Sequence, residues 1–74
     1  MTGDAPRDIS ISGEMIRLGQ FLKFSGLIDS GGDAKEAIID GHVQVNGEEE
    51  RRRGRQLHDG DLVTIAGRTV RVGG

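Results

Sequence analysis

The sequence predicts an α+β domain in which a two-helix hairpin packs on one face of a small antiparallel β-sheet. Two patterns indicate this class. Apolar residues recur with helical spacing between residues 15 and 40, and they alternate with polar residues from residue 43 onward. The chain has 74 residues, 34% of them hydrophobic, so it can build one thin core and no second folding unit. We expect one domain over residues 9–74, preceded by a flexible tail over residues 1–8 that holds the only proline.

The first part of the domain is expected to form a short strand and a helix. Residues 9–11 alternate in polarity, which is typical of a short edge strand. A helix is predicted over residues 15–25, because apolar residues from Met15 onward recur on one face. Gly26 follows at the point where helices commonly end in a left-handed residue.

The second helix has a start signal, an apolar stripe and an end signal. Ser30 is a hydroxyl N-cap placed three residues before Asp33, a variant of the capping box. Ala34 and Ile38 belong to the apolar stripe, and Gly41 ends the helix. The two helices are therefore expected to form a helical hairpin.

Strands are predicted for the second half of the chain. Val43–Val45 alternates and runs into Asn46-Gly47, the dipeptide favoured in type I′ hairpin turns. Residues 48–53 are expected to return as an edge strand that is polar on both faces. The remaining predicted elements are a turn at Asp59-Gly60 and a second hairpin over residues 62–65 and 69–72 around Ala66-Gly67.

Composition excludes several classes of function. The chain has no cysteine, so it forms no disulfide, thiol nucleophile or cysteine-bound metal site. Its net charge of −2 argues mildly against a nucleic-acid partner, although the basic residues can still gather on one face. No apolar run reaches the length of a membrane span or a signal peptide, so we expect a cytoplasmic protein without membrane contact.

The acidic residues and histidines do not predict a catalytic or metal site. Asp59 and Asp61 flank a turn glycine, where carboxylates normally serve turn geometry. Residues 48–50 are glutamates on alternating faces of a strand, so they cannot form a catalytic pair. His42 and His58 lack suitably spaced acidic partners and are interpreted as surface residues. We expect no enzyme activity, no cofactor, no metal and no small-molecule substrate.

Two groups of residues could bind phosphate. Gly31-Gly32 opens the second helix, so its free N–H groups could admit a phosphate beside Lys35, or the glycines could simply form a capped connection. From these residues alone, the two interpretations are equally favoured. The four arginines within residues 51–55 favour a solvated edge that the adjoining glutamates partly neutralise. Arg17 and Lys23, on the polar side of the first helix, could add to a basic surface.

The two phenylalanines are the only aromatic residues of the chain. Phe21 lies on the apolar stripe of the first helix and is expected in the core. Phe24 flanks that stripe near Arg17 and Gln20. It could stack on a nucleic-acid base, but core packing is the favoured interpretation because the supply of apolar residues is so small.

A series of short motifs runs from the first helix to the last turn. They are Arg17-Leu18-Gly19-Gln20-Phe21-Leu22, the segment from Ser30 through Ala34-Lys35 to Ile38-Ile39, Gly41-His42-Val43-Gln44-Val45-Asn46-Gly47, and Gly60-Asp61-Leu62-Val63. Together they resemble the αL RNA-binding motif, the domain named after ribosomal small-subunit protein four. The likeness is greatest to its small free-standing bacterial members of the YbcJ/YaaA type. The spacing from Ser30 to Gly47 is its most specific part.

This resemblance implies binding of structured RNA, either ribosomal or transfer RNA, across the helix hairpin and the following turn. It implicates Arg17, Ser30, Lys35 and the Asn46-Gly47 turn by position, and the other basic residues and glycines extend that surface. The full set of predicted RNA-binding residues is Arg17, Lys23, Ser30, Gly31, Gly32, Lys35, Asn46, Gly47, Arg51, Arg52, Arg53 and Arg55.

Two positions depart from the family pattern. The family often has Asp where Gly19 stands and a basic residue where Gly31 stands. The exposed amide groups of Gly31-Gly32 could partly replace that missing base. The likeness to the YbcJ type suggests that the arginines within residues 51–55 supply compensating charge.

We therefore expect non-catalytic binding of structured RNA in ribosome assembly or RNA processing, with ribosomal particles or RNA-processing proteins as further partners. One alternative is a protein-interaction module of a ribosome-associated complex, in which the acidic helix face of Asp33, Glu36 and Asp40 meets a basic partner. The other is a β-grasp sulfur carrier, because Gly73-Gly74 resembles the diglycine end of those proteins. Two consecutive helices fit that fold poorly.

Overall fold

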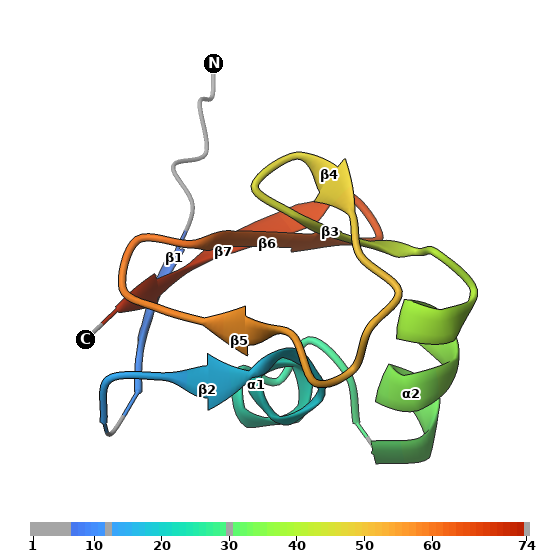
Figure 1. Cartoon of the computed structure of the whole chain (residues 1–74), viewed down its shortest axis with the longest axis horizontal. Helices are drawn as coiled ribbons and strands as arrows, with labels where there is room; N and C mark the ends of the chain where they lie inside the picture. Colours follow the sequence, from blue (N-terminus) through green and yellow to red (C-terminus); the bar gives the residue numbers. More distant parts are fainter. Residues whose placement is uncertain (1–6, 12, 30, 74) are drawn as a thin grey trace.

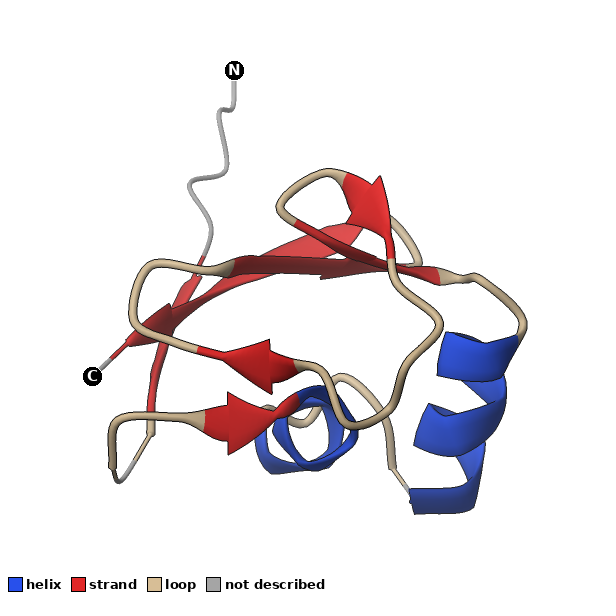
Figure 2. Ribbon diagram, viewed as in Figure 1, coloured by secondary structure: helices blue, strands red, loops and turns tan. Residues whose placement is uncertain are grey.

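The computed structural model describes residues 7–11, 13–29 and 31–73. Its elements are β1 (Arg7–Ser10), β2 (Ile16–Arg17), α1 (Leu18–Phe24), α2 (Gly31–Ile39), β3 (Val43–Val45), β4 (Glu48–Glu49), β5 (Gln56–Leu57), β6 (Leu62–Ile65) and β7 (Arg68–Gly73). The predicted α+β class is confirmed. Figures 1 and 2 show both helices on one side of the larger sheet, with β2 leading directly into α1, β5 beside β2, and α2 at one end of the molecule.

The larger sheet is mixed rather than wholly antiparallel. Its strand order is β1-β7-β6-β3-β4, and the pairs among β7, β6, β3 and β4 are antiparallel, as expected for two hairpins. β1 instead runs parallel to β7, with Arg7 opposite Val70 and Ser10 opposite Gly73. Parallel pairing arises because the first strand lies beside the last one, which no tight turn connects.

The first strand begins earlier than predicted. Arg7 and Asp8, which fall in the predicted tail, are paired in β1, and the rest of that tail lies outside the described residues. Ile11 continues the contact, since its N–H donates to the Gly73 carbonyl at 2.8 Å.

The first helix is shorter than its predicted range of residues 15–25. Met15 is 38% exposed and lies outside the core, and Ile16–Arg17 forms β2, which pairs antiparallel with β5. This prediction was wrong because the partner strand is distant in sequence, so nothing local indicates the pairing. The end of the helix was predicted correctly: Gly26 has a φ of +80° and its N–H donates to the Lys23 carbonyl at 3.2 Å.

The second helix follows its predicted apolar stripe. Ala34 and Ile38 are buried, and Gly41 ends the helix in the left-handed region with a φ of +80°. The predicted N-cap, Ser30, lies outside the described residues.

The hairpin turns were predicted correctly, but the edge strand was not. Asn46 and Gly47 both have positive φ, as a type I′ turn requires, and so do Ala66 and Gly67. β4 covers only Glu48–Glu49, and the chain then leaves the sheet as a loop over residues 50–55. A strand over residues 48–53 was therefore wrong, because Glu50 is buried and draws the loop inward.

One core fills the space between the sheet and the helices. Phe21 and Leu22 of α1 and Ile38 of α2 pack against the inner face of the sheet. The buried apolar residues are Ile11, Leu18, Phe21, Leu22, Ala34, Ile38, Val43, Val45, Leu57, Val63, Ile65, Val70 and Val72. None of the helices in the described ranges has the length and apolar character needed to cross a membrane.

Candidate nucleic-acid interface

The loop over residues 50–55 is packed against the start of α1. Arg17 precedes the helix with an extended backbone and makes no side-chain cap bond. The loop supplies the caps instead: the N–H of Leu18 donates to the Arg55 carbonyl at 2.8 Å, and that of Gly19 donates to the Arg53 carbonyl at 3.1 Å. Two otherwise unpaired helix donors are thus satisfied by backbone that is remote in sequence.

Gly19 allows this close approach. A Cβ at residue 19 would lie 2.6 Å from Cγ of Arg53, which is closer than real side chains come. The missing side chain at residue 19 therefore lets the Arg53 side chain lie across the start of the helix.

The loop and the helix together form an open groove with a cationic lining. Its side chains come from Arg17, Gln20, Lys23 and Arg53, and its floor includes Gly19 and Gly54. No carboxylate of the described chain forms an ion pair with Arg17, Lys23 or Arg53. Three uncompensated positive charges, contributed by two segments far apart in sequence, therefore face one groove.

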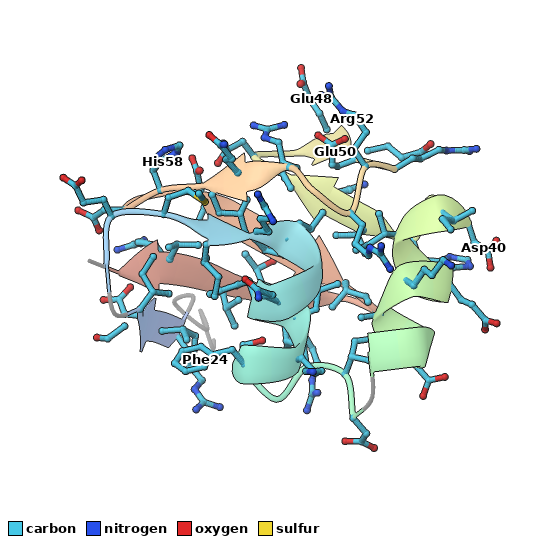
Figure 3. All side chains as sticks on the ribbon, turned by 60° about the horizontal axis from the view of Figure 1, so that its bottom comes forward. Phe24, Asp40, Glu48, Glu50, Arg52 and His58 are labelled. Carbon is cyan, nitrogen blue, oxygen red and sulfur yellow. The ribbon has the colours of Figure 1, made fainter. Side chains whose placement is uncertain are left out.

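The other three arginines of the loop are paired with glutamates. Arg51 Nε lies 2.6 Å from a Glu49 carboxylate oxygen, and both side chains are at least half exposed. Arg55 and Arg52 both bind Glu50, at 2.7 Å and 3.1 Å, and the N–H of Arg52 donates to the same carboxylate at 3.1 Å. Figure 3 shows Arg52 beside Glu50 at one edge of the molecule.

Glu50 is the anchor of the loop. It is only 6% exposed, and the hydrogen bonds from Arg55 and then Arg52 lower its pKa from 4.5 to about 2, against the opposing effect of burial. Arg55 and Arg52 therefore hold the loop in place, whereas Arg53 is left to face the groove. The sequence prediction treated these arginines as one group, and the structure divides them.

The remaining predicted site residues lie farther from this groove. Gly31 and Gly32 open α2, and Lys35 is exposed one turn later. The Asn46 side chain is bound within the protein: it accepts from the N–H of Leu62 at 2.9 Å and donates to Asp61 at 3.1 Å. This amide therefore holds two turns together. Gly47 is exposed beside it, and Ser30 lies outside the described residues.

Acidic and histidine residues lie on other surfaces. Glu36 and Asp40 are exposed on α2 and beyond its end, where Figure 3 shows Asp40 projecting outward. His42 and His58 are exposed. Among the residues whose positions are described, no three His, Asp or Glu side chains come together as a possible metal site.

Two contributors to positive charge were missed by the sequence interpretation, and a third was predicted only as one of a group. Arg7 and Arg68 were not singled out, yet both line one pocket at the C-terminal end of α1. Arg53 was not distinguished from its neighbours. Gly19 was the available signal for Arg53, because a glycine inside a helix can have a packing reason.

Comparisons with known proteins found a matching family model and similar sequences. The family model described as "S4 domain" matches residues 9–73. The "Probable ribosome maturation protein RlbA" of Bacillus subtilis (strain 168) is 54% identical over 59 residues, which cover 80% of this chain and 83% of that protein. The "Putative RNA-binding protein YbcJ" of Escherichia coli (strain K12) is 39% identical over 57 residues, covering 77% and 81% of the two chains.

Solved structures show the same fold. The solution structure of YbcJ from E. coli, described as revealing an αL motif involved in RNA binding, matches with a TM-score of 0.71 and 30% identity. That match covers 100% of this chain and 95% of the other. The crystal structure of 30S ribosomal protein S4e from Thermoplasma acidophilum matches with a TM-score of 0.63 at 22% identity, over 81% of this chain and 32% of that one. With its sequence match from β1 to β7 and its shared fold, the chain belongs to the S4 domain family, the αL-motif family that its helix and turn residues resemble.

Proposed function

We propose that this protein binds structured RNA without catalysing a reaction, through the groove lined by Arg17, Lys23 and Arg53, and that it acts in ribosome maturation. The observation that carries the proposal is this grouping of three unpaired cations on one side of an S4 domain whose net charge is −2. Phosphate groups are the ligands that such a surface attracts, and RNA is the polymer that presents them at regular spacing.

The distribution of ion pairs strengthens this interpretation. Four of the ten lysines and arginines are neutralised in the described structure, by Glu49, Glu50 and Asp8. Arg17, Lys23 and Arg53 are not, so the acidic total conceals a locally positive surface. The other predicted contacts in the described chain, Gly31, Gly32 and Lys35 of α2 and the Asn46-Gly47 turn, stay predictions outside this groove, and Ser30 lies outside the described residues.

The relatives favour ribosomal RNA over transfer RNA. The B. subtilis relative is named for ribosome maturation, and the E. coli relative for RNA binding. At 54% identity, the first is the better guide to the RNA of this chain. We therefore propose ribosomal RNA within a maturing particle as the partner.

A matched pair of double variants tests the surface. Arg17→Ala/Arg53→Ala removes two unpaired groove cations, and Arg51→Ala/Arg71→Ala removes two exposed, ion-paired ones with the same charge change. Affinity for purified ribosomal RNA is measured by fluorescence anisotropy over a series of KCl concentrations. We expect the first variant to have a salt slope shallower by about 1.4 to 1.8, because each of the two lost phosphate contacts removes about 0.7 to 0.9.

The control variant should keep nearly the wild-type slope. Equal slopes for the groove variant and the wild type would reject this groove as the RNA surface. Absence of salt-dependent binding by the wild type would reject RNA binding altogether. Transfer RNA, titrated in parallel, checks the preference for ribosomal RNA.

The two alternative functions have weaker support. Gly73 is paired in β7 opposite Ser10, and its carbonyl accepts from Ile11, so it is not part of a free tail as a sulfur carrier requires. Gly74 lies outside the described residues. A protein-interaction module is tested by nuclease treatment of the complex recovered from cells, since a protein contact survives it and an RNA contact does not.

A further inference from the structure

Phe24 is exposed although the chain has few apolar residues with which to build a core. Its exposed fraction is 60%, whereas Phe21, three residues earlier on the same helix, is fully buried. The prediction that Phe24 packs in the core was therefore wrong. It stands at the last position of α1, and Figure 3 shows it at the rim of the molecule.

A second cationic pocket lies directly after Phe24. Arg7 and Arg68 line it together with Ser25 and Leu27. Arg7 is opposite Val70, and Arg68 is two residues before it, so both arginines lie on the inner face of the sheet with the buried Val70. Neither forms an ion pair within the described part of the chain.

The Phe24 ring thus stands between two sets of unpaired cations. Lys23, the residue before it, lines the groove of α1, and Ser25, the residue after it, lines the second pocket. Gln20, another groove residue, is one helical turn before Phe24 and shares its face. α1 has seven residues, so it rises about 10 Å from the Leu18 end of the groove to the Phe24 end beside the second pocket.

A flat apolar ring between phosphate-binding sites suits one ligand in particular. Single-stranded nucleic acid presents bases that stack on aromatic side chains while its phosphates are held by flanking cations. A fully paired helix cannot present such a base, because its bases are stacked inside. On the basis of the RNA binding proposed above, we propose that Phe24 stacks on an unpaired base of the RNA, with the neighbouring phosphates held by Lys23 on one side and by Arg7 and Arg68 on the other.

The absence of tryptophan and tyrosine permits a direct test. Phe24→Trp places a single fluorophore at the proposed stacking position, and Ile39→Trp places one at a 51% exposed apolar position on α2 as the control. Each variant is titrated with an RNA stem–loop carrying a uridine loop, and with a blunt RNA duplex having the same number of phosphates. We expect the stem–loop to quench the tryptophan fluorescence of the Phe24→Trp variant and the duplex to leave it nearly unchanged. The two RNAs should not differ in their effect on the fluorescence of the control.

Affinity measurements complete the test. Phe24→Ala should weaken stem–loop binding by about 5- to 100-fold and leave duplex binding nearly unchanged, because stacking is lost but the phosphates remain. Arg68→Ala should weaken binding of the stem–loop and reduce the salt slope of that binding by about one. Arg71 lies on the same strand but is paired with Asp8 on the other face, so Arg71→Ala should change neither the affinity nor the salt slope.

The outcomes separate this proposal from the function on which it depends. Binding of both RNAs without fluorescence quenching, or equal loss of both affinities in Phe24→Ala, would overturn stacking and leave RNA binding intact. Failure of the wild-type protein to bind either RNA would overturn both. A Phe24→Ala variant that binds RNA normally but loses a protein partner would assign the ring to a protein contact and likewise overturn stacking.

Discussion

At the scale of single residues, Glu50 is a charged residue that would be expected on the surface but is buried in the structure. It is the last of three consecutive glutamates, and only its neighbours Glu48 and Glu49 are exposed. Burial of a carboxylate costs free energy unless donors compensate it, and here two arginines and one backbone N–H do so. The carboxylate therefore sets the path of the loop that carries Arg53 to Gly19.

We predict that Glu50→Gln destabilises the protein in a pH-dependent way. The folded-state pKa of Glu50 is lowered to about 2 from 4.5, so its stabilising effect is complete above about pH 5 and declines as the pH falls towards 2. Near neutral pH the variant should lose on the order of 2 kcal/mol in the free energy of unfolding, measured with urea. The difference from the wild type should shrink as the pH is lowered.

Glu48→Gln is the matched control for this prediction. Glu48 is exposed and forms no ion pair within the described ranges, so its free energy of unfolding should stay within about 0.5 kcal/mol of the wild type. A pH-independent difference for Glu50→Gln would show that the carboxylate contributes through packing rather than through its charge.

At the scale of elements, the two helices were predicted with unequal success for a physical reason. The signals of the second helix are local: a stripe containing Ala34 and Ile38, and a glycine end at Gly41. The start of the first helix depends on distant backbone, because Leu18 and Gly19 are capped by carbonyls of the loop over residues 50–55. Gly19 indicates a close approach within this range, but nothing in it identifies the distant loop as the partner.

The start of α2 offers a prediction that separates stability from binding. A Cβ at Gly32 would meet no atom within 4 Å, and alanine is favoured over glycine in a helix by about 0.5 to 1 kcal/mol. Gly32→Ala should therefore raise the melting temperature, measured by circular dichroism. If phosphate approaches the backbone there, the same variant should bind ribosomal RNA several-fold more weakly. A more stable protein with unchanged affinity would remove these glycines from the interface.

At the scale of the whole molecule, charge and core are divided between different parts of the chain. The chain has few apolar residues with which to build its core, so an exposed phenylalanine such as Phe24 is unexpected. The cations are divided in the same way: four of them brace the fold, and those facing the two pockets of α1 are free in the described chain.

Truncating the two phenylalanines to alanine should therefore lower the free energy of unfolding by very different amounts. Phe21→Ala empties the centre of the core and should cost about 3 to 5 kcal/mol, a large part of the roughly 4 to 11 kcal/mol expected for a domain of this size. Phe24→Ala should cost less than about 0.5 kcal/mol. Urea unfolding of both variants measures the contrast, and similar losses would contradict the division between core and binding surface.

Local chemistry was sufficient to predict the α+β class, the second helix, the type I′ turn at Asn46-Gly47 and the second hairpin around Ala66-Gly67, because periodicity, helix ends and turn dipeptides act over a few residues. The same sequence could not show that Arg53 faces the groove of α1, that the first strand pairs in parallel with the last, or that Phe24 faces solvent. Those features depend on contacts between residues far apart in the chain, such as Arg53 with Gly19 and Arg7 with Val70. These long-range contacts form only when the whole chain folds around its core.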